Sequence, residues 1–216
     1  MNWTQQIDGY CERLGPAFFA EPVNALTNAA FVVVALWLWR SSRGVERVLA
    51  AILLAIGVGS WLFHTHATVW AGVADVVPIV LFILVYVFAA HRRFLGWGVP
   101  ASLAAAALVL PYAAVAGGVF ARLPGLSISA SYWPVALLIA IYAVSLRRSM
   151  PDVARGLGIG AAVLSVSLGF RSIDMAVCPM VPVGTHFAWH LLNATMLGWM
   201  ITVLRRHRLE PRGAGR

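Results

Sequence analysis

The sequence predicts an all-α membrane protein, a seven-transmembrane helix bundle with its N-terminus outside and its C-terminus in the cytoplasm. Three observations lead to this fold class: the composition, the number of long apolar runs and the distribution of arginine. Of the 216 residues, 61% are hydrophobic and only 11% are charged, whereas about a quarter of a typical soluble domain is charged. Such a chain cannot cover a water-facing surface, and lipid must therefore be its main solvent.

The first 21 residues are polar, acidic and rich in turn formers. They lack the basic stretch followed by an apolar core that defines a secretory signal peptide, so the first apolar run is expected to remain as a helix. We therefore divide the chain into an extracytoplasmic N-terminal segment (1–21), a seven-span domain (22–204) and a basic cytoplasmic tail (205–216).

Seven apolar runs follow, and each approaches the roughly 20 residues that a helix needs to cross the hydrocarbon core. We expect spans at residues 22–39, 45–64, 73–90, 97–117, 131–146, 154–170 and 183–204. Turn-forming sequences, such as SSRG, LGWG, RLPG and MPD, lie between them. The sixth span is expected to be short, and its GLGIG stretch predicts close packing against a neighbouring helix.

Arginine is distributed unevenly between the two sides of such a bundle. All 16 basic residues are arginine, and 13 of them fall on one side. These are Arg40, Arg43, Arg47, Arg92, Arg93, Arg147, Arg148, Arg155, Arg205, Arg206, Arg208, Arg212 and Arg216, against Arg13, Arg122 and Arg171 on the other. The positive-inside rule places the arginine-rich side in the cytoplasm. Topology then explains the net charge of +8, and no nucleic-acid partner is expected.

The two cysteines fall on the same outer side in this orientation. Cys11 precedes the first span, and Cys178 lies between the sixth and the seventh. The outer side is oxidising in most cells. A disulfide between the N-terminal segment and the last outer loop is one interpretation, two unpaired thiols are the other, and topology alone does not decide between them.

Several polar residues inside the predicted spans, most of them ionisable, gather near the outer boundary. Ser60 and His64 end the second span, Asp75 is in the first turn of the third, and His186 and His190 begin the seventh. Ionisable groups within spans are rare and usually functional. Since these residues come from three spans at similar depth, we expect them to form one site.

The spacing of these residues indicates a catalytic zinc site. His186 and His190 are four residues apart, so they share a helix face, as do Ser60 and His64. Three imidazole nitrogens leave a fourth tetrahedral position for water, whose pKa zinc lowers to about 7. Asp75 is suited to act as general base, and the Ser60 hydroxyl to donate to a developing oxyanion.

Other interpretations of the polar residues stay open at this point. His66 is an alternative to His64, although it falls beyond the expected helix end and off the face of Ser60. Paired histidines also suit b-type haem, but its axial ligands normally lie deeper in a bundle and Asp75 would then have no purpose. Arg171 and Asp174, three residues apart at the end of the sixth span, are interpreted as a structural ion pair.

The complete set of motifs resembles the alkaline ceramidases. It comprises S-x-x-x-H at Ser60 and His64, Asp75 eleven residues later, and H-x-x-x-H at His186 and His190. The resemblance extends to YCERLGPAFFAEPVNALTN near the N-terminus and FRSIDMAVCPMVPVGTHFAWH near the C-terminus. That family is part of a superfamily of seven-span hydrolases with the adiponectin-receptor-like proteins and the lipid-remodelling proteins of the GPI pathway. The chain is most similar to the bacterial-type branch.

The resemblance implies a function and a set of ligands. It implies zinc on the three histidines, with a zinc-bound water cleaving ceramide to a fatty acid and a sphingoid base. It also implies calcium on an acidic segment, for which the matching residues are Glu12 and Glu21 with Asp8 as a third, although their spacing departs from the family pattern and Leu14 stands where another oxygen ligand is expected. It further favours the Cys11–Cys178 disulfide.

The resemblance also implies partners and a location. The expected partners are the bilayer and a ceramide-like lipid, and the expected location is the bacterial inner membrane. The arginine distribution predicts that the site lies toward the periplasmic face. Two competing functions remain: a non-enzymatic receptor or transporter with a structural zinc, and a hydrolase of another N-acyl or ester lipid.

Overall fold

The structure, a computed structural model, describes residues 2–209, with side chains described as far as His207. This part of the chain is all helical, and its only β-type pairing is an isolated bridge between Gln6 and Thr68. In chain order the helices are α1 (Pro22–Thr27), α2 (Ala29–Trp39), α3 (Val45–His66), α4 (Val69–Phe94), α5 (Val99–Phe120), the 3-10 helix η1 (Ser127–Ser129), α6 (Trp133–Leu146), α7 (Pro151–Val177) and α8 (His186–Leu209).

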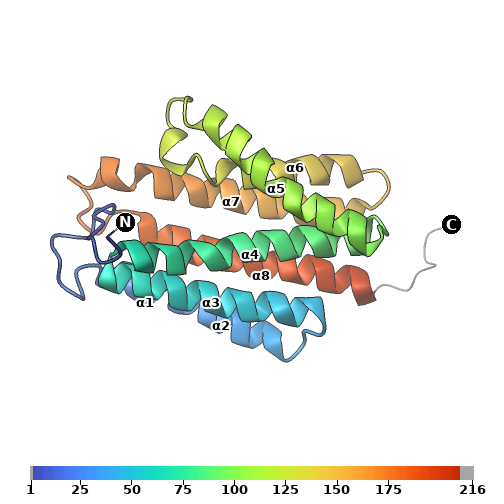
Figure 1. The fold of residues 1–216 in the computed structure, drawn as a ribbon, viewed down its shortest axis with the longest axis horizontal. Coiled ribbons are helices and arrows are strands. Elements are labelled where there is room, and N and C mark those ends of the chain that lie inside the picture. Colours follow the sequence, from blue (N-terminus) through green and yellow to red (C-terminus); the bar gives the residue numbers. More distant parts are fainter. Residues whose placement is uncertain (1, 210–216) are drawn as a thin grey trace.

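The long helices lie side by side in one elongated bundle (Figure 1). The N-terminal segment lies at one end, together with the connections that follow α3, α5 and α7. The connections that follow α2, α4 and α6 lie at the opposite end, where α8 also ends (Figure 1). The chain therefore traverses the bundle in alternating directions, as the sequence predicts.

Six helical segments within the described residues are long and apolar enough to cross a membrane, and α1 and α2 form one of them together. Apolar side chains face outward along them: Leu26, Trp37 and Val115 are each at least 70% exposed. In the part of the chain that the structure describes, α6 is apolar but has only 14 residues. At 1.5 Å per residue it measures about 21 Å, less than the roughly 30 Å of a hydrocarbon core.

The prediction of a short sixth span is wrong. The corresponding helix, α7, has 27 residues, and the short helix is α6. The predicted span stopped before Arg171 and Asp174, but hydrogen bonds satisfy both side chains, so the helix continues past them. Part of the predicted cytoplasmic tail is also helical, because α8 extends to Leu209. The rest of that tail, 210–216, lies outside the described residues.

The predicted close packing of the glycine-rich helix is confirmed on α7. A Cβ atom added at Gly156 would lie 2.7 Å from Val203 of α8, and one added at Gly160 would lie 2.5 Å from Met200. The absence of side chains at these two positions lets α7 approach α8. This contact lies toward the end of α8, whereas the histidines of that helix lie at its start.

Candidate metal centre

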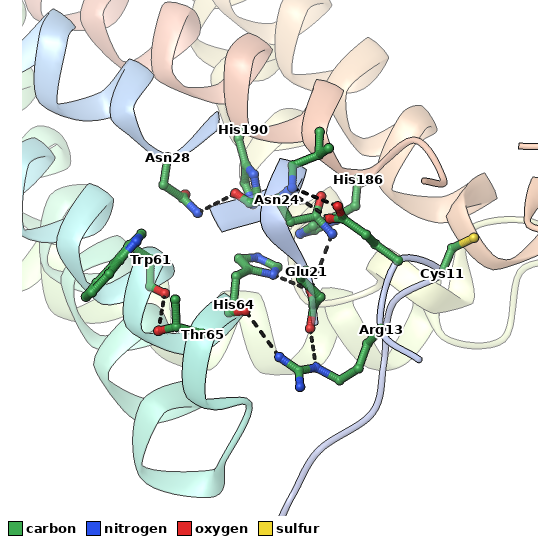
Figure 2. A network of polar contacts seen from close by, with 12 residues as sticks. Cys11, Arg13, Glu21, Asn24, Asn28, Trp61, His64, Thr65, His186 and His190 are labelled. Atoms are coloured by element: carbon green, nitrogen blue, oxygen red, sulfur yellow. Dashed lines mark hydrogen bonds and ion pairs between the residues drawn. The ribbon is translucent and has the colours of Figure 1, made fainter. Parts of the chain in front are cut away.

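Three histidines from two helices meet at the end of the bundle that carries the N-terminal segment. His64 is in the last turn of α3, and His186 and His190 are in the first turns of α8. Each is at most 1% exposed, and one potential ligand atom from each lies within 4.8 Å of the others. Figure 2 shows the three side chains together. Within the described residues, these three histidines form a group of side chains that could hold a metal ion.

Hydrogen bonds set the orientation of two of these rings. His64 Nδ1 lies 2.6 Å from Glu21 Oε2, and His190 Nδ1 lies 2.9 Å from Thr27 Oγ1. The Thr27 hydroxyl already donates to backbone carbonyls, so it accepts from His190. Both rings therefore donate from Nδ1, which leaves Nε2 available to a metal ion, the usual arrangement around a metal-binding histidine.

Two buried ring nitrogens in the cluster have no hydrogen-bond partner among the described residues. They are His186 Nδ1 and His190 Nε2. An unpaired buried polar atom costs free energy, and most such atoms in native proteins have a partner. Neutral imidazole nitrogens suit zinc and related transition metals. The donor set and the unpaired nitrogens together fit a bound metal ion.

The predicted Ser60 and Asp75 lie beside each other on neighbouring helices. Ser60 is 4% exposed, one turn before His64 on α3, and its side chain hydrogen-bonds to Asp75 of α4. The contact depends on Gly59, since a Cβ atom there would lie 2.1 Å from the carbonyl oxygen of Ala74. The close approach of α3 and α4 at this glycine brings the hydroxyl to the carboxylate.

A cavity of about 580 Å³ opens next to the cluster. Asp75, Arg171 and Tyr132 form part of its polar wall. The remaining lining is largely apolar and includes Phe63, Val69, Val73, Val76, Val77, Ile128 and Met175. The cavity therefore combines an apolar volume with a few polar groups at one wall, as ligand pockets usually do.

Tyr10 separates this cavity from the histidines. Its ring lines the cavity and stacks on His186, with ring centroids 3.8 Å apart. Burial raises the pKa of the Tyr10 phenol, so its hydroxyl is neutral at physiological pH. The histidines themselves are not part of the cavity wall. Tyr10 was not predicted as a site residue because nothing in the local sequence indicates that the N-terminal segment folds over α8.

The predicted ion pair between Arg171 and Asp174 is wrong. Arg171 donates instead to the carbonyl oxygen of Ile128 and to Ser129 Oγ, at 3.0 and 3.1 Å. Asp174 accepts hydrogen bonds from backbone N–H groups of the N-terminal segment and of α8. Backbone N–H groups at the start of a helix have no partner within the helix, and here they bind the carboxylate of Asp174.

The predicted calcium ligands do not fit a calcium site in this structure. Asp8 is exposed. Both carboxylate oxygens of Glu12 accept from backbone N–H groups at the start of α1, Val23 at 2.7 Å and Asn24 at 2.8 Å. Glu12 therefore caps a helix and has little capacity left for an ion.

Glu21 is also fully engaged. Its Oε1 accepts from Arg13 Nε at 2.5 Å, and its Oε2 contacts the ring of His64. Burial alone would raise the pKa of the Glu21 carboxyl, but the hydrogen bonds and charges of His64 and Arg13 outweigh burial and hold the pKa below its usual range. Arg13, a basic residue between two predicted calcium ligands, was not predicted to belong to the site.

Cys11 and Cys178 are joined by a disulfide, with their Cα atoms 5.5 Å apart. The bond connects the N-terminal segment to the loop between α7 and α8, across 167 residues of sequence. It lies at the same end of the bundle as the histidines, as Figure 2 shows for Cys11. The segment that carries Tyr10, Glu12 and Arg13 is therefore fixed covalently beside the cluster.

Comparison with known proteins assigns the chain to a family. No curated protein matches the sequence significantly. The family model described as Ceramidase matches residues 7–214, which is nearly the whole chain and includes every residue of the cluster. The chain therefore belongs to the ceramidase family.

Proposed function

We propose that the chain is a zinc-dependent hydrolase that cleaves the amide bond of ceramide-like lipids, releasing a fatty acid and a sphingoid base. The observation that carries the proposal is the buried group of three histidines, in which two ring nitrogens have no partner among the described residues. Membership of the ceramidase family supports a lipid amide as the substrate class.

His64, His186 and His190 would hold the ion. Three neutral imidazoles are a common donor set for catalytic zinc, because they leave a fourth position open. When bound, zinc makes water nucleophilic near neutral pH and polarises a carbonyl group. Glu21 and Thr27 accept the Nδ1 protons of two of the rings, which would leave Nε2 of each ring available to the ion.

Asp75 transfers the proton, and Ser60 stabilises the negative charge that develops on the carbonyl oxygen. Asp75 takes a proton from the attacking water as the new C–O bond forms at the amide carbon. It then delivers that proton to the nitrogen of the leaving amine as the C–N bond breaks. A hydroxyl rotates freely, so Ser60 can turn from Asp75 and donate to the carbonyl oxygen while that oxygen carries negative charge.

The cavity beside Asp75 would take the lipid. Its apolar wall suits acyl and sphingoid chains, and its lining includes Asp75 and also Tyr10, which stacks on His186 of the cluster. An amide carbonyl next to the head group of a two-chain lipid sits near the membrane boundary, which matches the position of the cluster at one end of the bundle. The arginine distribution supports seven spans with this end facing the periplasm.

The test compares His190→Ala with His66→Ala in detergent-purified protein. His66 is a matched control because it lies on α3 two residues from His64, yet it is outside the cluster. Elemental analysis should find about one zinc per chain in the wild type and in His66→Ala. His190→Ala should lose most of the zinc and nearly all release of fatty acid from ceramide.

Each result decides between named functions. Full turnover without zinc in His190→Ala would overturn the proposed chemistry. Zinc without turnover of any lipid in a panel of N-acyl and ester lipids would favour a receptor or transporter with a structural zinc. Turnover of another lipid in preference to ceramide would keep the chemistry and change the substrate.

A further inference from the structure

Arg13 lies in the N-terminal segment, outside the helices, yet its side chain is only 2% exposed. Figure 2 shows its guanidinium between Glu21 and the end of α3. A charged group buried this deeply is unfavourable unless an opposite charge and hydrogen bonds compensate for lost water. The contacts of Arg13 therefore indicate the role of its buried positive charge.

Every nitrogen of the guanidinium has a partner. Nε donates to Glu21 Oε1 at 2.5 Å. Nη1 donates to the carbonyl oxygens of Gly15 and Ala17, at 2.9 and 3.5 Å. Nη2 donates to the carbonyl oxygen of His64 at 3.1 Å. One carboxylate oxygen and three backbone carbonyl oxygens thus surround a single positive charge.

Oxygens of this kind are the ligands that calcium takes in proteins. The resemblance predicted calcium on Glu12 and Glu21, but the guanidinium binds Oε1 of Glu21, and backbone N–H groups bind both carboxylate oxygens of Glu12. The positive charge at this position belongs to the chain itself. Because a guanidinium is always charged and donates in fixed directions, it can fill the place without a supply of ions.

Arg13 is connected to the histidine cluster through hydrogen bonds. Glu21 binds Arg13 through Oε1 and the ring of His64 through Oε2, at 2.6 Å. Arg13 also binds the backbone carbonyl of His64. The ring and the backbone of this histidine are therefore both held by one arginine, through Glu21 and directly.

We propose that Arg13 is a built-in cation that replaces calcium: it fixes Glu21 and thereby the ring of His64, so the zinc affinity of this chain does not depend on calcium. Arg13 is a positioning residue, since it acts through Glu21 and does not contact the reacting atoms. The proposal rests on the proposed function only in treating His64 as a zinc ligand, and it requires no lipid turnover.

The first experiment measures the zinc dissociation constant of the detergent-purified full chain by competition with a chelator. Arg13→Met keeps an unbranched side chain similar to the aliphatic part of arginine but removes the charged guanidinium. It should weaken zinc binding roughly 10- to 100-fold, the usual effect of removing a group that orients a metal ligand. Arg13→Lys should lose less. Arg122→Met, an exposed arginine predicted on the same side, is the matched control and should bind zinc like the wild type.

A double-variant cycle distinguishes positioning from general loss of structure. If Arg13 acts through Glu21, Arg13→Met combined with Glu21→Gln should weaken zinc binding no more than the stronger single variant, because both remove the same connection. Additive losses would mean that Arg13 acts elsewhere and would overturn the proposal. Thermal unfolding of each variant shows whether it folds.

The second experiment needs only the wild type, and it tests the proposal even if Arg13→Met does not fold. Zinc binding is measured over the same series of buffered free zinc concentrations with and without millimolar calcium, and no difference in zinc affinity is expected. Calcium that strengthens zinc binding by the wild type overturns the proposal, as does unchanged zinc affinity in Arg13→Met. Zinc binding with the expected Arg13 effects but no lipid turnover would overturn the proposed function alone.

Discussion

The carboxylate of Asp174 accepts a hydrogen bond from the backbone N–H of His186 at 2.9 Å. The same oxygen accepts from the N–H of Thr185, and the other accepts from the N–H of Cys11. Asp174 belongs to α7, so it caps the start of α8 from a neighbouring helix, where N–H groups have no partner within the helix. One side chain thus fixes both a histidine of the cluster and the N-terminal segment beside it.

Asp174→Ala should lower the free energy of unfolding by roughly 1–3 kcal/mol, because buried backbone donors would lose their acceptor. The loss should also weaken metal binding, since His186 is the first residue of α8. Thermal unfolding in detergent measures the first effect and chelator competition the second.

Asp152→Ala is the matched control for that substitution. Asp152 is in the first turn of the same helix, but its side chain is 77% exposed and its contact with Arg155 is 3.8 Å. Exposed substitutions of this kind usually change stability by about 0.5 kcal/mol or less. Equal melting temperatures for the two variants would show that the cap contributes nothing.

Gly59→Ala should separate α3 from α4. The added Cβ would lie 2.1 Å from the carbonyl oxygen of Ala74, so the backbones must move apart, at a cost of roughly 1–3 kcal/mol. Since Ser60 and Asp75 follow these two residues directly, the rate of lipid hydrolysis should fall by more than the loss of folded protein explains.

Gly158→Ala is the corresponding control, because a Cβ atom there has no neighbour within 4 Å. It should leave hydrolysis unchanged and raise stability slightly, since alanine is favoured over glycine inside a helix by about 0.5–1 kcal/mol. Full activity per folded molecule in Gly59→Ala would contradict the role assigned to the close approach.

The histidines could be predicted from the sequence because their spacing is a property of the helix itself. His186 and His190 share a face in any helix, and the alternation of spans brings His64 to the same end. The helix boundaries were less predictable. α3 continues through His66, beyond the predicted end of that span at residue 64, yet His66 still lies outside the cluster.

The partners of these histidines could not be predicted in the same way. Glu21 and Arg13 reach His64 only because the N-terminal segment folds back over the end of the bundle, and nothing periodic in the sequence encodes that path. The i,i+3 spacing of Arg171 and Asp174 suggested an ion pair, but backbone donors of another helix compete for the carboxylate. Such competition depends on tertiary structure.

Removing the disulfide should destabilise the protein without unfolding the bundle. Cys178→Ser frees the N-terminal segment from the loop before α8, and loss of a native disulfide typically costs roughly 2–5 kcal/mol. Thermal unfolding measures the cost. Under denaturing, non-reducing conditions a maleimide probe should label no thiol in the wild type and one in Cys178→Ser. Two labelled thiols in the unreduced wild type would contradict the bond.

The orientation of the chain can be tested with reporters at the two ends of the bundle. Alkaline phosphatase is active only when exported, and green fluorescent protein fluoresces in the cytoplasm. With seven spans and 13 arginines on the inner side, a fluorescent protein fused to the C-terminus should fluoresce, and a phosphatase fused there should be inactive. A phosphatase inserted between α5 and α6 should be active.

The same fusions decide whether α6 crosses the membrane. It has only 14 residues, and the other six candidate spans of the described chain would by themselves return the C-terminus to the side of the N-terminus. If α6 crosses, the loop between α6 and α7 is cytoplasmic, and Arg147 and Arg148 lie where the positive-inside rule favours them. An exported C-terminus together with an exported α6–α7 loop would contradict seven spans. It would leave these two arginines on the outer side.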